Sequence, residues 1–209
     1  AGAAGYEDQV RAVAVGQLGY FVNSRVLTSA TYEAQHLGVE GAGLTAYANA
    51  YLLFMLPHGL ITVSLVTALF TRLSHAAHDR DTAAVTADLR RGMTLPAVVL
   101  IPATAIMVLL APFVLAAILP GTPRAATDAS VGVLVTMMLG LVPYGWFFLV
   151  QRAYYAYEDG RTPFGLQLVV TLVAVSVTLF GSTRPPEDVA TWVGIGQSVS
   201  NLTAALIGF

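Results

Sequence analysis

The chain contains no cysteine and no lysine among its 209 residues. Without cysteine it has no disulfide, no thiol chemistry and no cysteine-based metal site. Without lysine it has no P-loop, because that nucleotide-binding motif requires one. Charged residues make up only 11% of the chain, whereas a soluble domain carries about 25%. Because 56% of the residues are hydrophobic, the composition indicates an integral membrane protein.

The few charges nearly cancel. Arginine supplies all ten Lys/Arg cations against twelve acidic residues, for a net charge of −2, which argues against nucleic acid as a partner. Arginine without lysine, in an alanine-rich chain, indicates a coding bias and an actinobacterial source. The first residues, AGAAGYEDQV, lack an initiating Met and the basic start of a signal peptide. We therefore expect the chain to be a piece of a longer protein.

Six apolar segments follow one another along the chain. Each is long enough to cross the ~30 Å hydrocarbon core of a bilayer, given some tilt. The sequence therefore predicts an all-α, polytopic membrane helix bundle, with six transmembrane helices in a single membrane domain. The predicted spans cover residues 10–30, 44–74, 94–119, 129–156, 164–181 and 189–209.

Arginine is unevenly distributed between the two sides that these spans define. One side carries the N-terminus and the connections 75–93 and 157–163, and it holds Arg11, Arg72, Arg80, Arg90, Arg91, Arg152 and Arg161. The positive-inside rule makes that side cytoplasmic. We expect a multi-pass protein of the bacterial cytoplasmic membrane with both ends of this chain in the cytoplasm. The connection 75–93 is expected to be either an amphipathic helix at the interface or a solvated linker.

The segment 44–74 organises the prediction, because it carries no charge until Arg72 and is broken in the middle by Pro57. Proline removes a helical hydrogen bond, so we expect a bend there, with Gly59 adding freedom. Pro143 and Gly145 repeat the pattern, Leu56-Pro57-His58-Gly59 against Val142-Pro143-Tyr144-Gly145. Repeated, proline-broken helices are typical of transporters, so these four residues are predicted hinges.

Arg25 is the candidate site residue of the first span. An arginine at the centre of a span costs at least ~2.5 kcal/mol to insert, and its planar guanidinium suits phosphate. It is expected either to line an aqueous cavity or to reach the interface beside Glu33. The same two alternatives apply to Asn23, which is expected either to line the cavity or to hold two helices together.

Three residues of the second span are further candidates for binding substrate. His58 lies beside the predicted bend, where it either titrates and gates a step or bonds a freed carbonyl. Asn49 and Tyr51 precede it on the same helix and either line the cavity or pack against a neighbouring helix. Arg152 flanks an aromatic belt near the cytoplasmic interface and is expected to meet lipid phosphates.

The predicted spans contain no carboxylate, which removes the usual intramembrane proton relay and acid–base pair. His75 and His78 are expected to be solvated rather than to bind metal. The sequence therefore predicts no enzyme, no cofactor and no metal site.

Two blocks resemble one known family. Ala46-Tyr47, Leu56-Pro57-His58-Gly59, Thr67-Ala68-Leu69-Phe70 and Leu73-Ser74 resemble one helix of the MurJ (MviN) lipid II flippases. Arg152-Ala153-Tyr154-Tyr155-Ala156 with Asp159-Gly160-Arg161-Thr162-Pro163 resembles a second segment of that family.

The resemblance implies most of the second lobe of a two-lobed exporter of the multidrug/oligosaccharidyl-lipid/polysaccharide superfamily. Its members move undecaprenyl-pyrophosphate-linked peptidoglycan precursor, lipid II, across the membrane by alternating access. Many members carry Arg and Glu where this chain has Leu52 and Met55, and Arg25 is our proposed substitute. The carboxylate that binds sodium in some members is missing from the fifth span.

Two other functions remain open on the sequence: export of another polyprenyl-linked glycan, and a membrane scaffold for cell-wall synthesis partners. Cytoplasmic regulatory partners would act through regions outside this chain. Membrane lipids are expected partners in every case.

Overall fold

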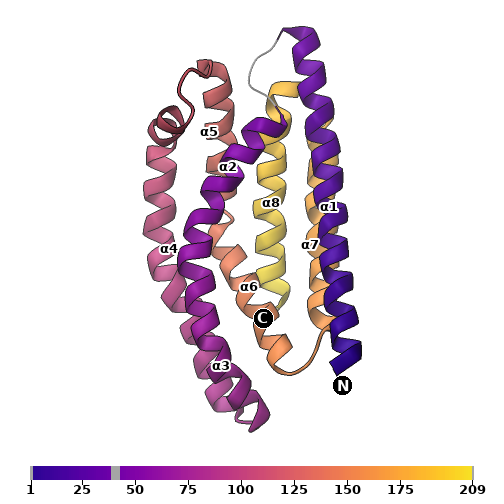
Figure 1. Ribbon diagram of the computed structural model, residues 1–209, viewed down its shortest axis with the longest axis vertical. Helices are drawn as coiled ribbons and strands as arrows, with labels where there is room; N and C mark the ends of the chain where they lie inside the picture. The colour runs from indigo at the N-terminus through magenta and orange to yellow at the C-terminus, as the bar shows by residue number, and fades with distance from the viewer. Residues whose placement is uncertain (1, 39–42, 209) are drawn as a thin grey trace.

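The computed structural model describes residues 2–38 and 43–208, and these residues form helices without a strand. The predicted all-α membrane helix bundle is confirmed (Figure 1). The helices are α1 (Gly2–Leu37), α2 (Leu44–Pro57), the π-helix η1 (His58–Val63), α3 (Ser64–His78), α4 (Thr82–Ile118), α5 (Arg124–Met138), α6 (Leu141–Ala156), α7 (Arg161–Gly181) and α8 (Pro186–Gly208).

Each predicted span corresponds to a helix or to a broken helix. Three helices within the described residues are long and apolar enough to cross a membrane: Leu44–His78, Thr82–Ile118 and Arg161–Gly181. The pair α5 and α6, bent by 47°, meets the same test as one broken span. The helices α1 and α8 are more polar, because they carry several amide side chains that line a cavity described below. Six spans therefore remain a prediction.

The helices run alternately up and down, so that successive connections lie at opposite ends (Figure 1). The connections after α1, α4 and α7 lie at one end, which we call the upper end, and those after α3 and α6 lie at the lower end. This matches the two sides predicted from the sequence. The helix α1 packs against α7 and α8, whereas α2 packs mainly against α5, and α8 also contacts both α5 and α6.

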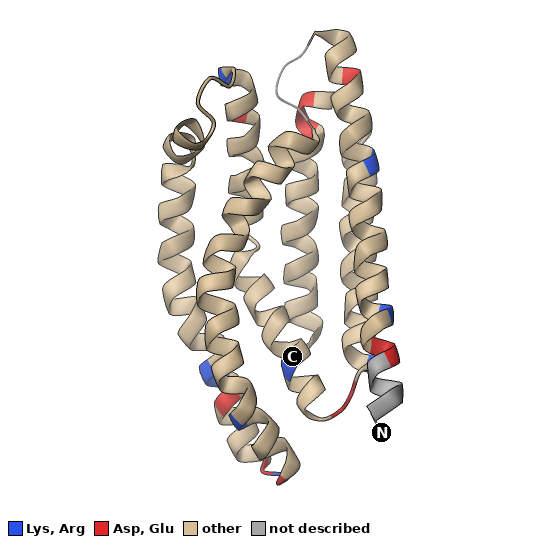
Figure 2. Ribbon diagram, viewed as in Figure 1, with Lys and Arg blue, Asp and Glu red and all other residues tan. Residues whose placement is uncertain are grey.

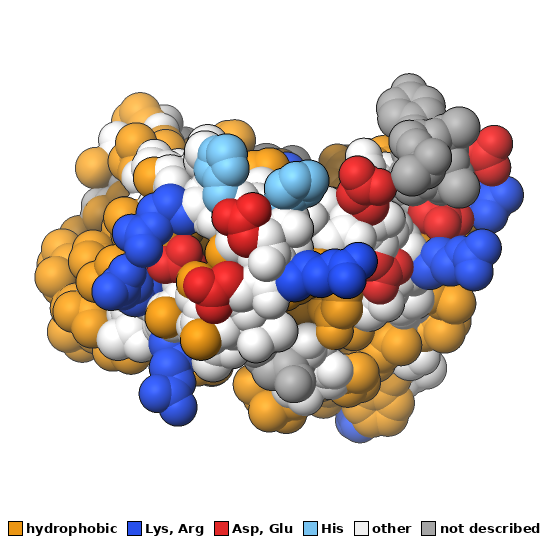
Figure 3. Space-filling view, turned by 90° about the horizontal axis from the view of Figure 1, so that it is seen from below, with side chains coloured by type: hydrophobic (Ala, Val, Ile, Leu, Met, Phe, Trp, Pro, Cys, Tyr) orange, Lys and Arg blue, Asp and Glu red, His pale blue; other side chains and the backbone are white. Residues whose placement is uncertain are grey.

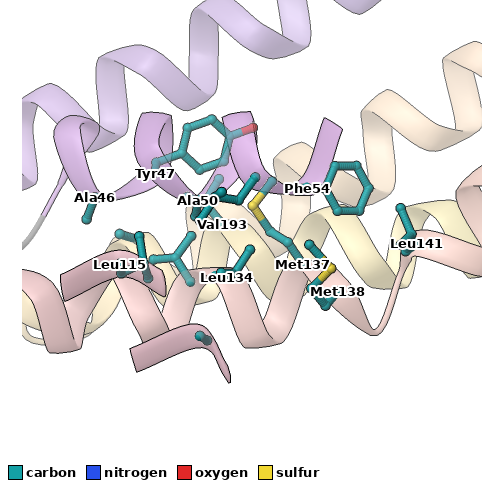
Figure 4. Packing of buried hydrophobic residues seen from close by; sticks show 14 of the residues in the cluster. Ala46, Tyr47, Ala50, Phe54, Leu115, Leu134, Met137, Met138, Leu141 and Val193 are labelled. Carbon is teal, nitrogen blue, oxygen red and sulfur yellow. The ribbon is translucent and has the colours of Figure 1, made fainter. Parts of the chain in front are cut away.

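The largest apolar core lies between α2, α4, α5 and α8 (Figure 4). Small residues Ala46 and Ala50 let α2 approach α5 closely, while Phe54, Met137 and Leu141 pack farther along the same core. Close packing of small against large side chains is how membrane helices associate, because lipid is as apolar as the core itself. The helices α2, α4, α5 and α8 thus form one closely packed half of the described bundle, and α1 packs against α8 outside it.

The predicted linker or interfacial helix at 75–93 is wrong. Instead α3 and α4 continue past the apolar segments as a helical hairpin, which turns within residues 79–81. The Asp81 carboxylate caps α4 by accepting from the Ala84 amide at 2.9 Å, which favours a helix start there. Within the hairpin the carboxylate of Asp88, 3% exposed, lies 3.1 Å from Arg72 and 3.5 Å from Arg91.

The hairpin is therefore held by ion pairs as well as by packing. The polar residues 75–93 belong to the ends of two helices that extend beyond the apolar segments. Figure 2 shows these charges at the lower end of α3 and α4, and Figure 3 shows blue arginine and red acidic side chains side by side on that face.

The backbone irregularity predicted at Pro57 takes the form of the six-residue π-helix that follows it. Proline cannot donate to the preceding turn, and a π-turn is one way to absorb the mismatch. The second irregularity lies just before Pro143, at Gly140, between α5 and α6. Pro143 itself sits in the first turn of α6, where its missing N–H has no helical partner to lose.

The hydroxyl of Ser198, on α8, donates to the backbone carbonyls of Thr136 and Met137 beside this second break. The Thr136 carbonyl, which lies at the interruption, is thereby satisfied within the protein, as lipid requires.

Candidate functional site

A cavity of about 340 Å³ lies between α1 and α2, with α6, α7 and α8 forming its floor. It exists because α1 and α2 leave their common connection in different directions and contact each other little (Figure 1). The helix α1 follows α7, while α2 follows α5. The cavity is therefore built into the bundle by two separate packing partners rather than by a loop.

The lining is polar but uncharged. Amide side chains come from four of the five helices, and tyrosine and phenylalanine rings supply most of the remaining surface. Among the described residues that line the cavity, none is Arg, Asp, Glu or His. The amides are Gln17, Asn23, Gln151, Gln167, Gln197 and Asn201; the aromatic rings are Tyr20, Tyr47, Tyr51, Phe54, Tyr144, Phe147 and Phe148.

Several of these polar groups already have partners. The Thr178 hydroxyl of α7 donates to Asn23 Oδ1 at 2.9 Å in a buried contact. Gln197 Nε2 donates to Asn201 Oδ1 at 3.3 Å. Asn201 Nδ2 has no hydrogen-bond partner among the described residues, although Asn201 is fully buried. A buried donor without a partner is costly, so an acceptor inside the cavity would stabilise this arrangement.

This lining can donate and accept hydrogen bonds but cannot balance a charge. Amide groups offer both donors and acceptors, and hydroxyls do the same. Among the described residues no group of three or more His, Cys, Asp or Glu side chains could hold a metal ion. The site therefore suits an uncharged, hydroxyl- or amide-bearing group.

Two of the predicted binding residues, Asn23 and Tyr51, line this cavity. Asn23 also joins α1 to α7 through Thr178, so both alternatives left open for it describe part of its position. Tyr51 stacks on Tyr47 with 6.0 Å between ring centroids.

Arg25 does not join them. It is exposed on α1 and lines a separate groove of about 690 Å³ with Glu33, Ser182 and other residues near the upper end. The sequence correctly placed Arg25 and Asn23 on one helix, but they are two residues apart and therefore face different sides. Of the two alternatives left open for Arg25, the cationic lining is therefore not found among the described residues of this cavity, and Arg25 shares the separate groove with Glu33.

The other predicted binding residues lie around the cavity rather than in its lining. His58 is 2% exposed, 4.4 Å from the Tyr144 ring and 5.5 Å from Phe148. Asn49 is half-buried on α2. Arg152 is exposed and its guanidinium lies 4.9 Å above the Phe148 ring, so it borders a residue that lines the cavity.

Of the two glycines among the predicted hinges, one has open space around it and the other is closely packed. A side chain at Gly59 would meet nothing within 4 Å, whereas a Cβ at Gly145 would lie 3.2 Å from Thr62 of η1. Pro57 and Pro143 border the two irregular segments described above. Movement about these residues remains a prediction.

Sequence reasoning gave no role to Gln151, Gln197 and Asn201. The available signal was an amide inside an otherwise apolar segment, with Gln197 and Asn201 one helical turn apart. Asn201 also begins an Asn-Leu-Thr sequence, which resembles a glycosylation site but lies inside a predicted span.

Comparison with known proteins gives three findings. A sequence model of the family described as "Lipid II flippase MurJ" matches residues 8–209. A protein of Borreliella burgdorferi strain B31, named "Probable lipid II flippase MurJ", is 25% identical over 145 residues, covering 68% of this chain and 29% of that protein. The structure "Lipid II flippase MurJ, inward closed conformation" superposes with a TM-score of 0.77 at 21% identity, covering 94% of this chain and 40% of that one.

The chain thus spans well under half the length of the proteins it matches, and the structural likeness shows a shared fold. The family model covers nearly the whole chain and agrees with the blocks around Pro57 and Arg152. This chain is a multi-pass bacterial membrane protein and belongs to the lipid II flippase MurJ family.

Proposed function

We propose that this chain is one lobe of a flippase that moves lipid II, an undecaprenyl-pyrophosphate-linked peptidoglycan precursor, across the bacterial cytoplasmic membrane. The observation that carries the proposal is the family match over residues 8–209, together with a polar cavity enclosed by membrane helices. The function is transport rather than catalysis, and all six segments cross the membrane with both ends of the chain in the cytoplasm.

The cavity supports transport because it is a polar space inside an apolar bundle. A lipid-linked headgroup crossing the membrane needs hydrogen-bonding partners that lipid cannot supply. The amides of α1, α6, α7 and α8 supply them at the point where α1 and α2 separate. The exposed apolar faces of α4 and α7 can meanwhile lie against lipid.

Alternating access requires helices that can change their relative position. The two helices that border the cavity opening, α1 and α2, contact each other little, and α2 continues into the π-helix η1. Irregular turns of this kind occur where helices bend in function. We propose that α2 moves against α1 about the segment from Pro57 to Gly59, while the break at Gly140 lets α6 follow.

The experiment fills the cavity. Gly16 lines it, and a Cβ at this position would already lie 3.4 Å from Gln167 Nε2, so Gly16→Phe places a ring in the cavity. Gly165→Phe is the matched control, because Gly165 is exposed on α7 with nothing within 4 Å of its Cβ. In a strain depleted of its own flippase, we expect Gly16→Phe in the full-length protein to abolish growth and the appearance of lipid II in the outer leaflet.

Protein levels must match the wild type in both variants. Normal growth and normal lipid II transfer with Gly16→Phe would contradict the proposal. The scaffold alternative makes the opposite prediction, in which Gly16→Phe is tolerated and Asp88→Ala in the α3–α4 hairpin is not, because that hairpin is the part projecting at the lower end.

A further inference from the structure

We infer that the cavity between α1 and α2 is a binding site for an uncharged sugar, and that it takes no part in holding phosphate or a cation. The inference rests on the proposed function and deepens it, because it states which part of a lipid-linked glycan this lobe recognises. Three observations carry it: the charge-free lining, the pairing of amides with aromatic rings, and one buried amide without a partner.

The charge-free lining decides against phosphate. A phosphate group is recognised by arginine or lysine, or by clustered backbone N–H groups. The two arginines that the sequence predicted to bind substrate do not line this cavity. Arg25 lines the separate groove with Glu33, and Arg152 is exposed with its guanidinium over the outer ring of Phe148. A phosphate in the cavity would leave water without gaining a cation.

The same lining decides against a cation. A bound metal ion needs oxygen ligands that also supply negative charge, and carboxylates are the usual source. The described lining residues contain no carboxylate. Its amide oxygens are partly engaged, since Asn23 Oδ1 accepts from Thr178 and Asn201 Oδ1 accepts from Gln197.

What the lining offers is the chemistry of a sugar site. Each hydroxyl of a sugar both donates and accepts a hydrogen bond, and so does each glutamine or asparagine amide. The C–H faces of a sugar ring are apolar and pack on aromatic rings, which have a large apolar face. Gln151, Gln167 and Gln197 reach the same cavity as the rings of Tyr51, Phe147 and Phe148.

Asn201 is an independent indication that the cavity binds a polar group. Its side chain is fully buried, borders the cavity and leaves Nδ2 without an acceptor among the described residues. A sugar hydroxyl in the cavity provides that acceptor. The volume of about 340 Å³ lies in the range of small-molecule sites, roughly 300–1,000 Å³.

The test uses the full-length protein in lipid nanodiscs and saturation-transfer difference NMR, which detects weak binding. The probe is N,N′-diacetylchitobiose, an uncharged disaccharide, with inorganic pyrophosphate and sodium chloride added in separate arms. We expect transfer to the sugar protons, unchanged by pyrophosphate or by replacing sodium with choline. Asn201→Leu and Gln197→Leu should weaken sugar binding about tenfold or more, because a site that hydrogen-bonds hydroxyls loses a partner.

Ser176→Ala is the control. Ser176 is exposed on α7, donates to the Leu172 carbonyl of its own helix and does not line the cavity, so this variant should bind the sugar as the wild type does. Gln151→Leu is a second cavity variant at a half-buried position, for use if the substitutions at the buried Asn201 fail to fold.

Equal sugar binding by the wild type and all folded cavity variants would overturn the inference. So would sugar binding that pyrophosphate or sodium displaces from the cavity. The two proposals fail separately. A protein that transfers lipid II while its cavity variants bind sugar normally removes only this inference, whereas cavity-dependent sugar binding without lipid II transfer removes only the flippase.

Discussion

Replacing Gly140 by alanine tests how the break between α5 and α6 is maintained. The backbone there, with φ −88° and ψ 1°, is open to alanine, so conformation does not require glycine. Space does. A Cβ on Gly140 would lie 2.6 Å from both Cα and Oγ of Ser198 on α8. The Cα is backbone and cannot turn away, so α8 must shift.

The expected cost follows from that contact. Overpacking of this kind costs about 1–3 kcal/mol. A shift of α8 also draws the Ser198 hydroxyl away from the carbonyls of Thr136 and Met137, which share its one hydrogen. A hydrogen bond is worth about 0.5–1.5 kcal/mol. We expect Gly140→Ala to lower the free energy of unfolding by about 2 kcal/mol in total, within the range of these two effects.

Gly165→Ala is the matched control. The same methyl group there meets nothing within 4 Å, and alanine in a helix is up to about 1 kcal/mol more favourable than glycine. This variant should therefore be as stable as the wild type or more so. The two substitutions are chemically identical, and only the distance to a neighbouring helix differs between them.

The assay is thermal unfolding of the full-length protein in detergent, followed by tryptophan fluorescence. A change of 1 kcal/mol moves Tm by roughly 2–4 °C in a unit of this size, so Gly140→Ala should melt several degrees below Gly165→Ala. Adding Ser198→Gly should restore only part of the loss, because the Cα remains. If Gly140→Ala melts with the control or above it, the close approach of α8 does not hold the break.

Three further predictions concern side chains at other levels of the bundle. Thr178→Val removes the buried hydrogen bond to Asn23 and should destabilise the α1–α7 contact by about 0.6–2 kcal/mol, whereas an unchanged Tm would mean that the bond contributes nothing. The Thr162 hydroxyl lowers the pKa of Asp159, followed by the Thr162 and Arg161 amides and the Arg161 charge. A lowered carboxyl pKa stabilises the fold at pH values above the ordinary pKa near 4, and this stabilisation is lost as the pH falls through the folded pKa. The Tm should therefore drop on acidification, and Asp159→Asn should make that drop smaller. Asp88→Ala leaves Arg72 without its buried partner and should raise amide hydrogen exchange at the hairpin turn 79–81, while exchange at the upper end stays as in the wild type.

Much of the architecture was predictable because hydrophobic length is a local property. The apolar segment that begins at Leu44 and the one that ends at Gly181 coincide with helix ends. The lower hairpin was not predictable in this way. Residues 75–93 are polar, which shows that they leave the apolar layer, but a helix that projects into water and a linker have the same composition. The pairing of Asp88 with Arg72 of the neighbouring helix decides between them.

The site was only partly predictable, because depth along a helix is visible in a sequence and direction around it is less so. Arg25 and Asn23 lie at nearly the same depth, yet Asn23 faces α7 and Arg25 faces outward. The break at Gly140 lies three residues before Pro143, at the point where Ser198 of α8 approaches Gly140 and donates to the Thr136 carbonyl. Such contacts between distant segments leave no local signal.

The two proline-containing tetrapeptides, residues 56–59 and 142–145, lie against each other in the structure. The His58 and Tyr144 rings are 4.4 Å apart, and Thr62 of η1 lies beside Gly145. Irregular backbone inside a membrane protein has to be covered by protein or by water, because lipid offers no hydrogen bonds. Tyr144 and Gly145 of α6 cover part of η1 in this way, and the absence of a side chain at Gly145 lets Thr62 come close. A substitution in either tetrapeptide should therefore also affect the packing of the other.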